Sequence, residues 1–137
     1  MTHYADANLL HDALIGHSLT VILHFTNSTP IDWYVKKQAM VETTTYGSEF
    51  VAARTCVEQI IDLRNTLHYL RVHVLEKSYM FGDNESVVGS STRVYAKLHK
   101  CHTALSFYCV HEAIASKYVD FIFLPGNKNP ADIMSKH

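Results

Sequence analysis

The segment Tyr79-Met80-Phe81-Gly82-Asp83-Asn84-Glu85-Ser86 joins a short apolar run to an acid and then to polar residues that open helices. This pattern predicts a strand over 78–83 and a short helix over 84–89. In open α/β sheets, ligands bind at the carboxyl ends of the strands. The segment therefore indicates an α/β fold with Asp83 at a ligand-binding edge.

Further strands are expected on both sides of this segment. Residues 3–8 predict a first strand. Residues 19–25 are β-branched and apolar, residues 31–35 alternate in part, and the turn residues 27–30 lie between them, so a hairpin is expected. Residues 118–124 predict the last strand, and we interpret the aromatic residues of 31–35 and 118–124 as part of the sheet core.

Helices are predicted from apolar residues that recur at intervals of three and four. One long helix is expected to begin at Glu49, where the helix dipole favours a carboxylate in the first turn. The hydroxyls of residues 43–45 are suited to cap it. Its buried face is expected to comprise Phe50, Ala53, Val57, Ile60, Leu67 and Leu70. A second helix is expected over about 95–116, with Leu98, Cys101, Leu105, Tyr108 and Cys109 on one side, and a last helix is expected to start near Pro130.

The order of these elements is βββ-α-β-α-α-β-α. Parallel strands need a crossover, and both crossings contain a helix. The sequence therefore predicts a five-stranded mixed sheet, three antiparallel strands and then two parallel ones, with helices on both faces.

Composition limits the classes of function. A chain of 137 residues and 15.6 kDa fits one domain with a sizeable core. The net charge of −1 argues against tight binding to nucleic acid through charge alone. Three cysteines without a CxxC pair favour a reducing compartment. No apolar run approaches the roughly 18 residues that span a bilayer, so no membrane contact is expected.

Four carboxylates occupy comparable places in this order: Asp6, Glu49, Asp83 and Asp132. We interpret them as one metal site. Two carboxylates about 4 Å apart repel each other by about 4 kcal/mol at an effective dielectric of 20. Four of them together require either a cation or bound protons. The alternative is that they are unrelated surface charges, and Glu49 alone is also explained by the helix dipole.

Several ordered motifs carry a resemblance to a known family. They are Asp6-Ala7-Asn8, Trp33-Tyr34-Val35-Lys36-Lys37-Gln38, Thr44-Thr45-Tyr46-Gly47-Ser48-Glu49-Phe50, Gly82-Asp83-Asn84-Glu85-Ser86 and Asn129-Pro130-Ala131-Asp132-Ile133-Met134-Ser135-Lys136. In order and spacing the chain resembles the ribonuclease H domain of a Ty1/copia-type retrotransposon Pol polyprotein. It departs from the family at Asn8 and Gly47, where the family has acids that are not metal ligands.

The resemblance implies that residues 1–137 form a single ribonuclease H-like domain, a piece of a larger polyprotein. It implies an endoribonuclease that hydrolyses the RNA strand of RNA·DNA hybrids during reverse transcription. The catalytic and metal-binding residues would be Asp6, Glu49, Asp83 and Asp132, with two Mg²⁺ ions for which Mn²⁺ can substitute. The expected partners are the hybrid and a reverse transcriptase domain of the same polyprotein. The expected location is the cytoplasm, within virus-like particles, with access to the nucleus.

Other residues are predicted to contact the substrate. Thr44 and Thr45 could donate hydrogen bonds to phosphate, and Lys37 could contact the backbone. Asn8, Asn84 and Ser86 could reach the 2′-hydroxyls that distinguish RNA from DNA. The segment Lys100-Cys101-His102 matches a Lys-His pair of the family, so His102 joins the predicted substrate-binding residues.

Two other functions are consistent with the same residues. A catalytically weak or inactive relic would keep the fold as an interaction module, and another nuclease or transposase of the same fold would act on duplex DNA. A zinc site built from His99, His102 and the two nearby cysteines is disfavoured, because no second paired motif exists.

Overall fold

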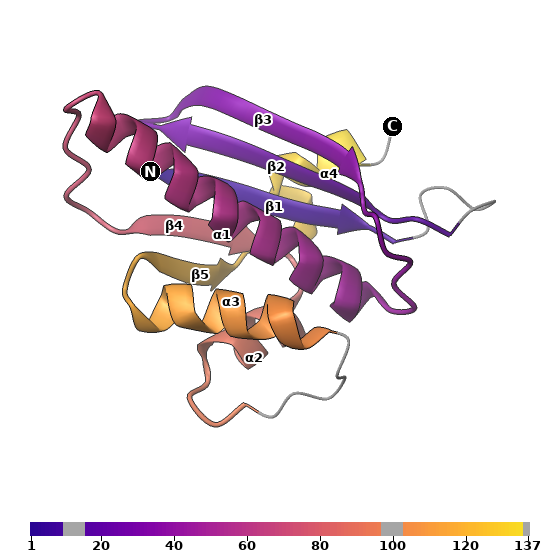
Figure 1. The fold of residues 1–137 in the computed structure, drawn as a ribbon. Coiled ribbons are helices and arrows are strands. Elements are labelled where there is room, and N and C mark those ends of the chain that lie inside the picture. Colours follow the sequence, from indigo (N-terminus) through magenta and orange to yellow (C-terminus); the bar gives the residue numbers. More distant parts are fainter. Residues whose placement is uncertain (10–15, 97–102, 136–137) are drawn as a thin grey trace.

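The protein is described by a computed structural model that covers residues 1–9, 16–96 and 103–135. Five strands form one mixed sheet in the order β3-β2-β1-β4-β5 (Figure 1). Neighbours β1–β2 and β2–β3 are antiparallel, whereas β1–β4 and β4–β5 are parallel, which confirms the predicted sheet. The strands are β1 (Thr2–Asn8), β2 (Leu19–Thr26), β3 (Thr29–Lys37), β4 (Ser78–Gly82) and β5 (Val119–Phe123).

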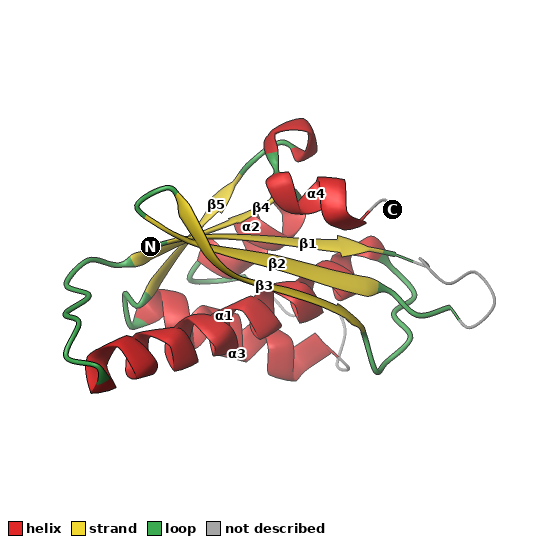
Figure 2. Cartoon of the chain, turned by 90° about the horizontal axis from the view of Figure 1, so that it is seen from above, coloured by secondary structure: helices red, strands yellow, loops and turns green. Residues whose placement is uncertain are grey.

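The helices cover the two faces of the sheet unequally. Helices α1 and α3 lie on one face and α4 lies on the other, against β1 and β2 (Figure 2). The helical elements are α1 (Thr45–Tyr69), α2 (Glu85–Thr92), α3 (Ala104–Ala115), the single 3₁₀ turn η2 (Gly126–Lys128) and α4 (Pro130–Ser135).

The main core lies between the sheet and α1 and α3. Its largest fully buried side chains include Phe50 and Ile60 of α1, Ile22 of β2 and Met80 of β4. Burial of each such side chain stabilises the fold by about 1.5–3 kcal/mol. A smaller cluster of Leu19, Val21 and Ala131 lies beneath α4. Most of the buried apolar packing against the sheet therefore lies on the α1 side, and much less lies on the α4 side.

Helix α1 begins earlier than its apolar pattern predicts. Thr44 caps it, since its hydroxyl accepts a hydrogen bond from the Gly47 amide at 3.2 Å. The first turn therefore contains no acid, and the prediction that Glu49 lies there is wrong. The buried face ends at Ile60, and Leu70 is 63% exposed. The last turns of α1 extend past the sheet (Figure 1).

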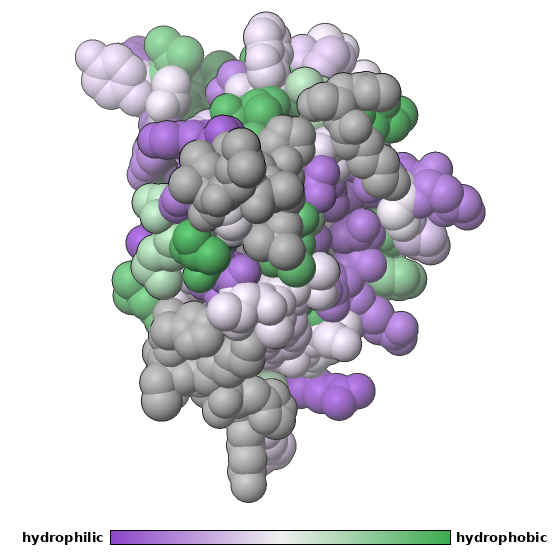
Figure 3. Space-filling view, turned by 90° about the vertical axis from the view of Figure 1, so that its right-hand side faces the viewer, coloured by the Kyte–Doolittle hydropathy of each residue, from purple (hydrophilic) through white to green (hydrophobic). Residues whose placement is uncertain are grey.

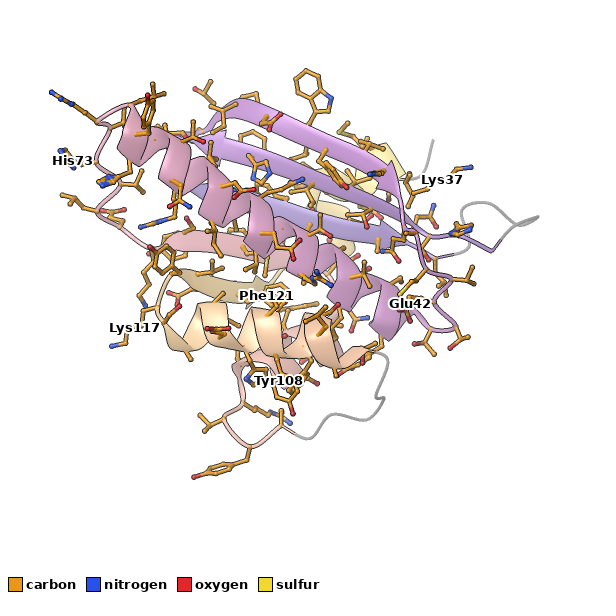
Figure 4. All side chains as sticks on the ribbon, in the orientation of Figure 1. Lys37, Glu42, His73, Tyr108, Lys117 and Phe121 are labelled. Atoms are coloured by element: carbon orange, nitrogen blue, oxygen red, sulfur yellow. The ribbon has the colours of Figure 1, made fainter. Side chains whose placement is uncertain are left out.

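The helix predicted over 95–116 is shorter in the described part of the chain. Tyr95 lies in a turn, residues 97–102 are outside the described residues, and α3 starts at Ala104. The predicted apolar side is only partly correct: Cys109 packs against the core, but Leu105 and Tyr108 are exposed, and Tyr108 points away from the sheet (Figure 4). The side that faces the core comprises Ser106, Phe107, Val110 and Ala113.

Two smaller expectations also change. Helix α2 continues through Gly89 to Thr92 rather than ending at 89. Strand β3 is an edge strand among the described residues, and only part of it contributes to the core: Tyr34 packs against the main cluster, whereas Trp33 is 68% exposed. Alternation places Trp33 and Tyr34 on opposite faces of the sheet, but it does not determine how much of each side chain is buried.

Gly47 is closely packed, and its contact with Glu42 can be tested by substitution. A Cβ at residue 47 would collide with the buried carboxylate of Glu42, lying 2.9 Å from Glu42 Cδ. We expect Gly47→Ala to destabilise the fold by about 1–3 kcal/mol. Gly89, in α2, is the matched control, because no described atom lies within 4 Å of its added Cβ. Gly89→Ala should stabilise by about 0.5–1 kcal/mol. Urea unfolding measures both, and equal effects of the same sign would contradict the predicted contact.

Among the described residues, no helix is both long enough and apolar enough to cross a bilayer.

Candidate metal centre

Three carboxylates meet at the carboxyl end of the central strands. Asp6 lies in β1, Asp83 follows β4, and Asp132 lies in the first turn of α4. Tyr4 pairs with Phe81 in the parallel β1–β4 ladder, so the same register two residues on places Asp6 beside Asp83. One oxygen from each of the three side chains lies within 4.8 Å of the others. The chain therefore brings three hard oxygen donors to one point.

Glu49 lies beside this group, although it is not one of the three mutually close acids. It is 9% exposed and lines the same cleft as the three aspartates. Its Oε1 accepts a hydrogen bond from the Ala7 amide of β1 at 3.3 Å. Glu49 therefore reaches from α1 to the strand that carries Asp6.

Helix α4 is held against β1 by two asparagines, and this contact positions Asp132. Asn129 is buried, donates to the Ala5 carbonyl at 3.1 Å and accepts from the Ala131 amide at 3.1 Å. At the other end, Asn8 Nδ2 donates to the Ser135 carbonyl at 2.7 Å. The helix is therefore tied to β1 on both sides of Asp132.

Asp83 has its own close neighbour in η2. A Cβ added at Gly126 would lie 3.1 Å from Asp83 Oδ2, which is tighter than an ordinary contact. A residue without a side chain at 126 therefore lets the turn after β5 approach this carboxylate.

Burial and mutual repulsion raise the pKa values of two of the acids, Asp6 and Glu49. Burial raises the pKa of Glu49 well above its ordinary value, and the carboxylates of Asp6 and Asp83 raise it further. Burial also raises the pKa of Asp6, with added repulsion from Asp83 and Asp132, while a hydrogen bond with Ser135 acts in the opposite direction. A carboxylate cluster with raised pKa values is stabilised by a divalent cation, because the cation replaces protons and cancels the repulsion.

The carboxylates open onto a polar cleft of about 640 Å³. Four of the predicted substrate-binding residues line it: Asn8, Thr45, Asn84 and Ser86. Two of them also support helices, since Asn8 donates to Ser135 and the Asn84 oxygen accepts from the Ser86 and Val87 amides at 3.1 and 3.2 Å. Figure 3 views the molecule from the end where β1 finishes, and hydrophilic side chains gather along one flank of that face.

The other predicted substrate-binding residues lie outside this lining. Thr44 is engaged as the cap of α1. Lys37 is exposed at the end of β3 (Figure 4) and is not among the residues that line the cleft. His102 lies outside the described residues, as do His99 and Cys101 of the disfavoured zinc site. The described part of the chain therefore gathers the acids and four of the seven predicted contact residues.

Sequence reasoning missed the residues that hold the acids in place. Asn129 begins the last of the quoted motifs and Gly126 lies three residues before it, but no role was predicted for either. Asn129 could have been found from the preference for asparagine just before a helix that starts with proline. Gly126 has no such signal, because its neighbour Asp83 is remote in sequence.

Comparisons with known proteins give one sequence relative and many structures. No family model matches the chain. The Retrovirus-related Pol polyprotein from transposon TNT 1-94 of Nicotiana tabacum is 25% identical over 134 residues. That alignment covers 97% of this chain but only 10% of the polyprotein, so the chain spans a small part of its relative.

The structural matches are close in shape and remote in sequence. The RNase H1 of the archaeon Halobacterium salinarum NRC-1 aligns with a TM-score of 0.71 at 11% identity, covering 98% of this chain and 92% of that one. LC11-RNase H1, solved in complex with an RNA/DNA hybrid, gives 0.71 at 16%, covering 98% and 91%. The prototype foamy virus protease-reverse transcriptase gives 0.67 at 13%, covering 98% of this chain and 20% of that one.

At these identities the solved structures establish the fold alone. The sequence relative adds that a similar segment occurs in a retrotransposon Pol polyprotein. Both agree with the predicted resemblance and with the predicted fold class. The chain thus has the ribonuclease H fold and is similar, over nearly its whole length, to a segment of a retrotransposon Pol polyprotein.

Proposed function

We propose that this chain is a metal-dependent endoribonuclease that hydrolyses the RNA strand of RNA·DNA hybrids during retroelement reverse transcription. The observation that carries the proposal is the meeting of Asp6, Asp83 and Asp132 within 4.8 Å, with Glu49 in the same cleft. Hydrolases of phosphodiesters use carboxylate clusters of this kind to bind divalent cations.

The residues fit Mg²⁺, with Mn²⁺ as a substitute. Mg²⁺ prefers hard oxygen ligands and is held by one or a few carboxylates together with substrate phosphate. When bound, two such ions supply an activated water and charge stabilisation at the leaving oxygen. Asp6 and Asp83 would hold both ions from neighbouring strands. Glu49 would hold one ion and Asp132 the other, and the products would carry a 5′-phosphate and a 3′-hydroxyl.

The cleft also offers groups that suit an RNA strand. Thr45 and Ser86 lie along it with hydroxyls that can donate to phosphate oxygens. Asn8 and Asn84 lie close to the acids and could meet 2′-hydroxyls, by which RNA is distinguished from DNA. Contacts from Lys37, Thr44 and His102 remain predictions from the sequence.

The proposed partner is a reverse transcriptase domain of the same polyprotein. The relative from tobacco is a Pol polyprotein, and in the foamy virus protein the same fold occupies about a fifth of a protease-reverse transcriptase chain. Because the net charge here is −1, a tethered neighbour would have to raise the effective concentration of the hybrid. The same proposal places the protein in cytoplasmic virus-like particles with access to the nucleus.

Metal binding should be visible as stabilisation. We expect Mg²⁺ or Mn²⁺ to raise the melting temperature, because an ion at 100 times its dissociation constant stabilises the native state by about 2.7 kcal/mol. The same preparation should cleave a labelled RNA·DNA hybrid, and neither single-stranded RNA nor duplex DNA. Thermal unfolding with increasing metal and gel analysis of the products measure the two effects.

The outcomes separate the alternatives. A protein with neither a metal-dependent shift nor cleavage would support the interaction module instead. Preferential cleavage of duplex DNA would support another nuclease of the same fold. Asp120→Asn is the control, because Asp120 pairs with Lys77 at 3.0 Å on the surface, away from the cleft, and should leave the metal response unchanged.

A further inference from the structure

Gln38 lies buried just after β3, under the first turns of α1. Its side chain is 6% exposed, and its Nε2 donates two hydrogen bonds, to Thr20 Oγ1 of β2 and to the Ser48 carbonyl of α1, both at 2.9 Å. Its backbone is fixed as well, because its amide donates to the Ser18 carbonyl at 2.8 Å and its carbonyl contacts His17 Nδ1 at 2.6 Å. Gln38 therefore joins the sheet to the helix at the residue before Glu49.

These contacts close a ring that contains Glu49. Thr20, which accepts from Gln38, is the direct partner of Ala7 in the antiparallel β1–β2 ladder. Ala7 in turn donates its amide to Glu49 Oε1 at 3.3 Å. The first turns of α1 are thus tied to β2 through Gln38 and to β1 through Glu49, at the same level of the sheet.

The segment before α1 restrains the same turns from another side. Glu42 is buried and packs against Gly47, where a Cβ cannot be accommodated without displacing its carboxylate. Figure 4 shows Glu42 beside the beginning of α1. Since Gln38 and Glu42 both belong to the connection between β3 and α1, this connection sets where the helix begins and how far it lies from β1.

We propose that Gln38 is a positioning residue for Glu49: it holds the start of α1 so that this carboxylate meets the Ala7 amide and faces the aspartates. The geometric part depends only on the contacts described. The effect on metal binding rests on the proposed function. Residues that orient metal ligands typically change metal affinity by 10–100-fold when they are replaced.

The test compares two glutamine-to-methionine substitutions on the full chain. Gln38→Met keeps the length of the side chain and removes both hydrogen bonds. Gln59→Met is the matched control, because Gln59 also joins α1 to β2, through His24 Nε2 at 2.9 Å, but does not line the cleft. Thr20→Val, which keeps the side-chain shape and removes only the acceptor on β2, replaces Gln38→Met if that variant does not fold.

The first readout needs neither metal nor activity. Hydrogen exchange followed by NMR at the Ala7 amide reports whether Glu49 stays in place. We expect exchange about tenfold faster in Gln38→Met than in Gln59→Met when both are compared at equal global stability. Equal exchange at Ala7 in the two variants would overturn the positioning role.

The second readout is the Mn²⁺ concentration at half-maximal thermal stabilisation. We expect an increase of about tenfold in Gln38→Met and no change beyond twofold in Gln59→Met. An unchanged midpoint in Gln38→Met would overturn the link to the metal. If the wild-type chain itself shows no metal response, the proposed function fails, while the Ala7 exchange still decides the role of Gln38.

Discussion

Asp83→Asn is expected to abolish hybrid cleavage while making the metal-free protein more stable. The substitution keeps the shape of the side chain and removes one of three charges that lie within 4.8 Å of each other. Loss of a direct metal ligand removes several kcal/mol of transition-state stabilisation, which corresponds to a fall in rate of about 10³-fold or more. Relief of repulsion should raise the free energy of unfolding without metal by about 1 kcal/mol.

Both effects can be measured on one preparation. Urea unfolding without metal gives the stability, and cleavage of a labelled hybrid with Mg²⁺ or Mn²⁺ gives the rate. Asp120→Asn controls for the loss of an acid outside the cleft and should change neither quantity appreciably. Metal-dependent cleavage that persists unchanged in Asp83→Asn would remove the proposed mechanism.

A buried histidine pair is expected to make the fold sensitive to acid. His3 Nδ1 lies 2.7 Å from His24 Nδ1, and His24 Nε2 lies 2.9 Å from Gln59 Oε1. With the Gln59 oxygen as acceptor, His24 carries its proton on Nε2, so His3 donates through Nδ1. His3 Nε2 is then a buried acceptor without a hydrogen-bond partner among the described residues. A second proton on His3 would therefore place a positive charge in a buried site with no hydrogen-bond acceptor for Nε2–H among the described residues.

The pKa of His3 sets the direction of this effect. Burial, together with the smaller effects of the charges of His24, the N-terminal amine and Arg64, lowers the pKa of His3 from 6.5 to about 3. Below pH 6.5 the unfolded chain binds a proton that the folded chain does not. The contribution of His3 to the free energy of unfolding is therefore complete above pH 6.5. It falls by about 1.4 kcal/mol per pH unit as the pH decreases toward 3.

His3→Gln isolates this contribution, because it keeps an N–H donor and cannot be protonated. Between pH 7.5 and 5, the wild-type chain should lose about 2 kcal/mol relative to the variant in urea unfolding. The comparison is needed because Glu49 acts in the opposite direction: its pKa is raised, so acidification favours its folded state. Parallel stability curves for the two proteins would show that His3 does not carry the effect.

The sequence predicted the order of the strands and the convergence of the aspartates because both depend on local patterns. Apolar runs mark the strands, and an acid that follows a central strand must lie at the edge of the sheet. The start of α1 was misplaced because its apolar period begins at Phe50, whereas the cap is Thr44. Trp33 was wrongly assigned to the core. Alternation shows which side chains share a face of the sheet, but it does not show whether a helix covers that face.

The supporting contacts could not be predicted in the same way. Gln38 meets Ser48, and Asn129 meets Ala5, through single hydrogen bonds between segments that only the folded chain brings together. No spacing or composition marks such a pair. The acids of the candidate site could therefore be predicted from the sequence, whereas the partners of the residues that position them could not.

Helix α4 is six residues long and rests on a small apolar cluster and the two asparagine contacts. An element held by so few contacts is expected to detach in local unfolding events that leave the main core closed. Each detachment would carry Asp132 away from the other two aspartates, so the centre would be dismantled and rebuilt repeatedly within a protein that stays folded. A ligand or neighbouring segment that stabilises the docked α4 would increase the population of the complete site. One that binds the detached α4 would decrease it, and neither would change the stability of the rest of the chain.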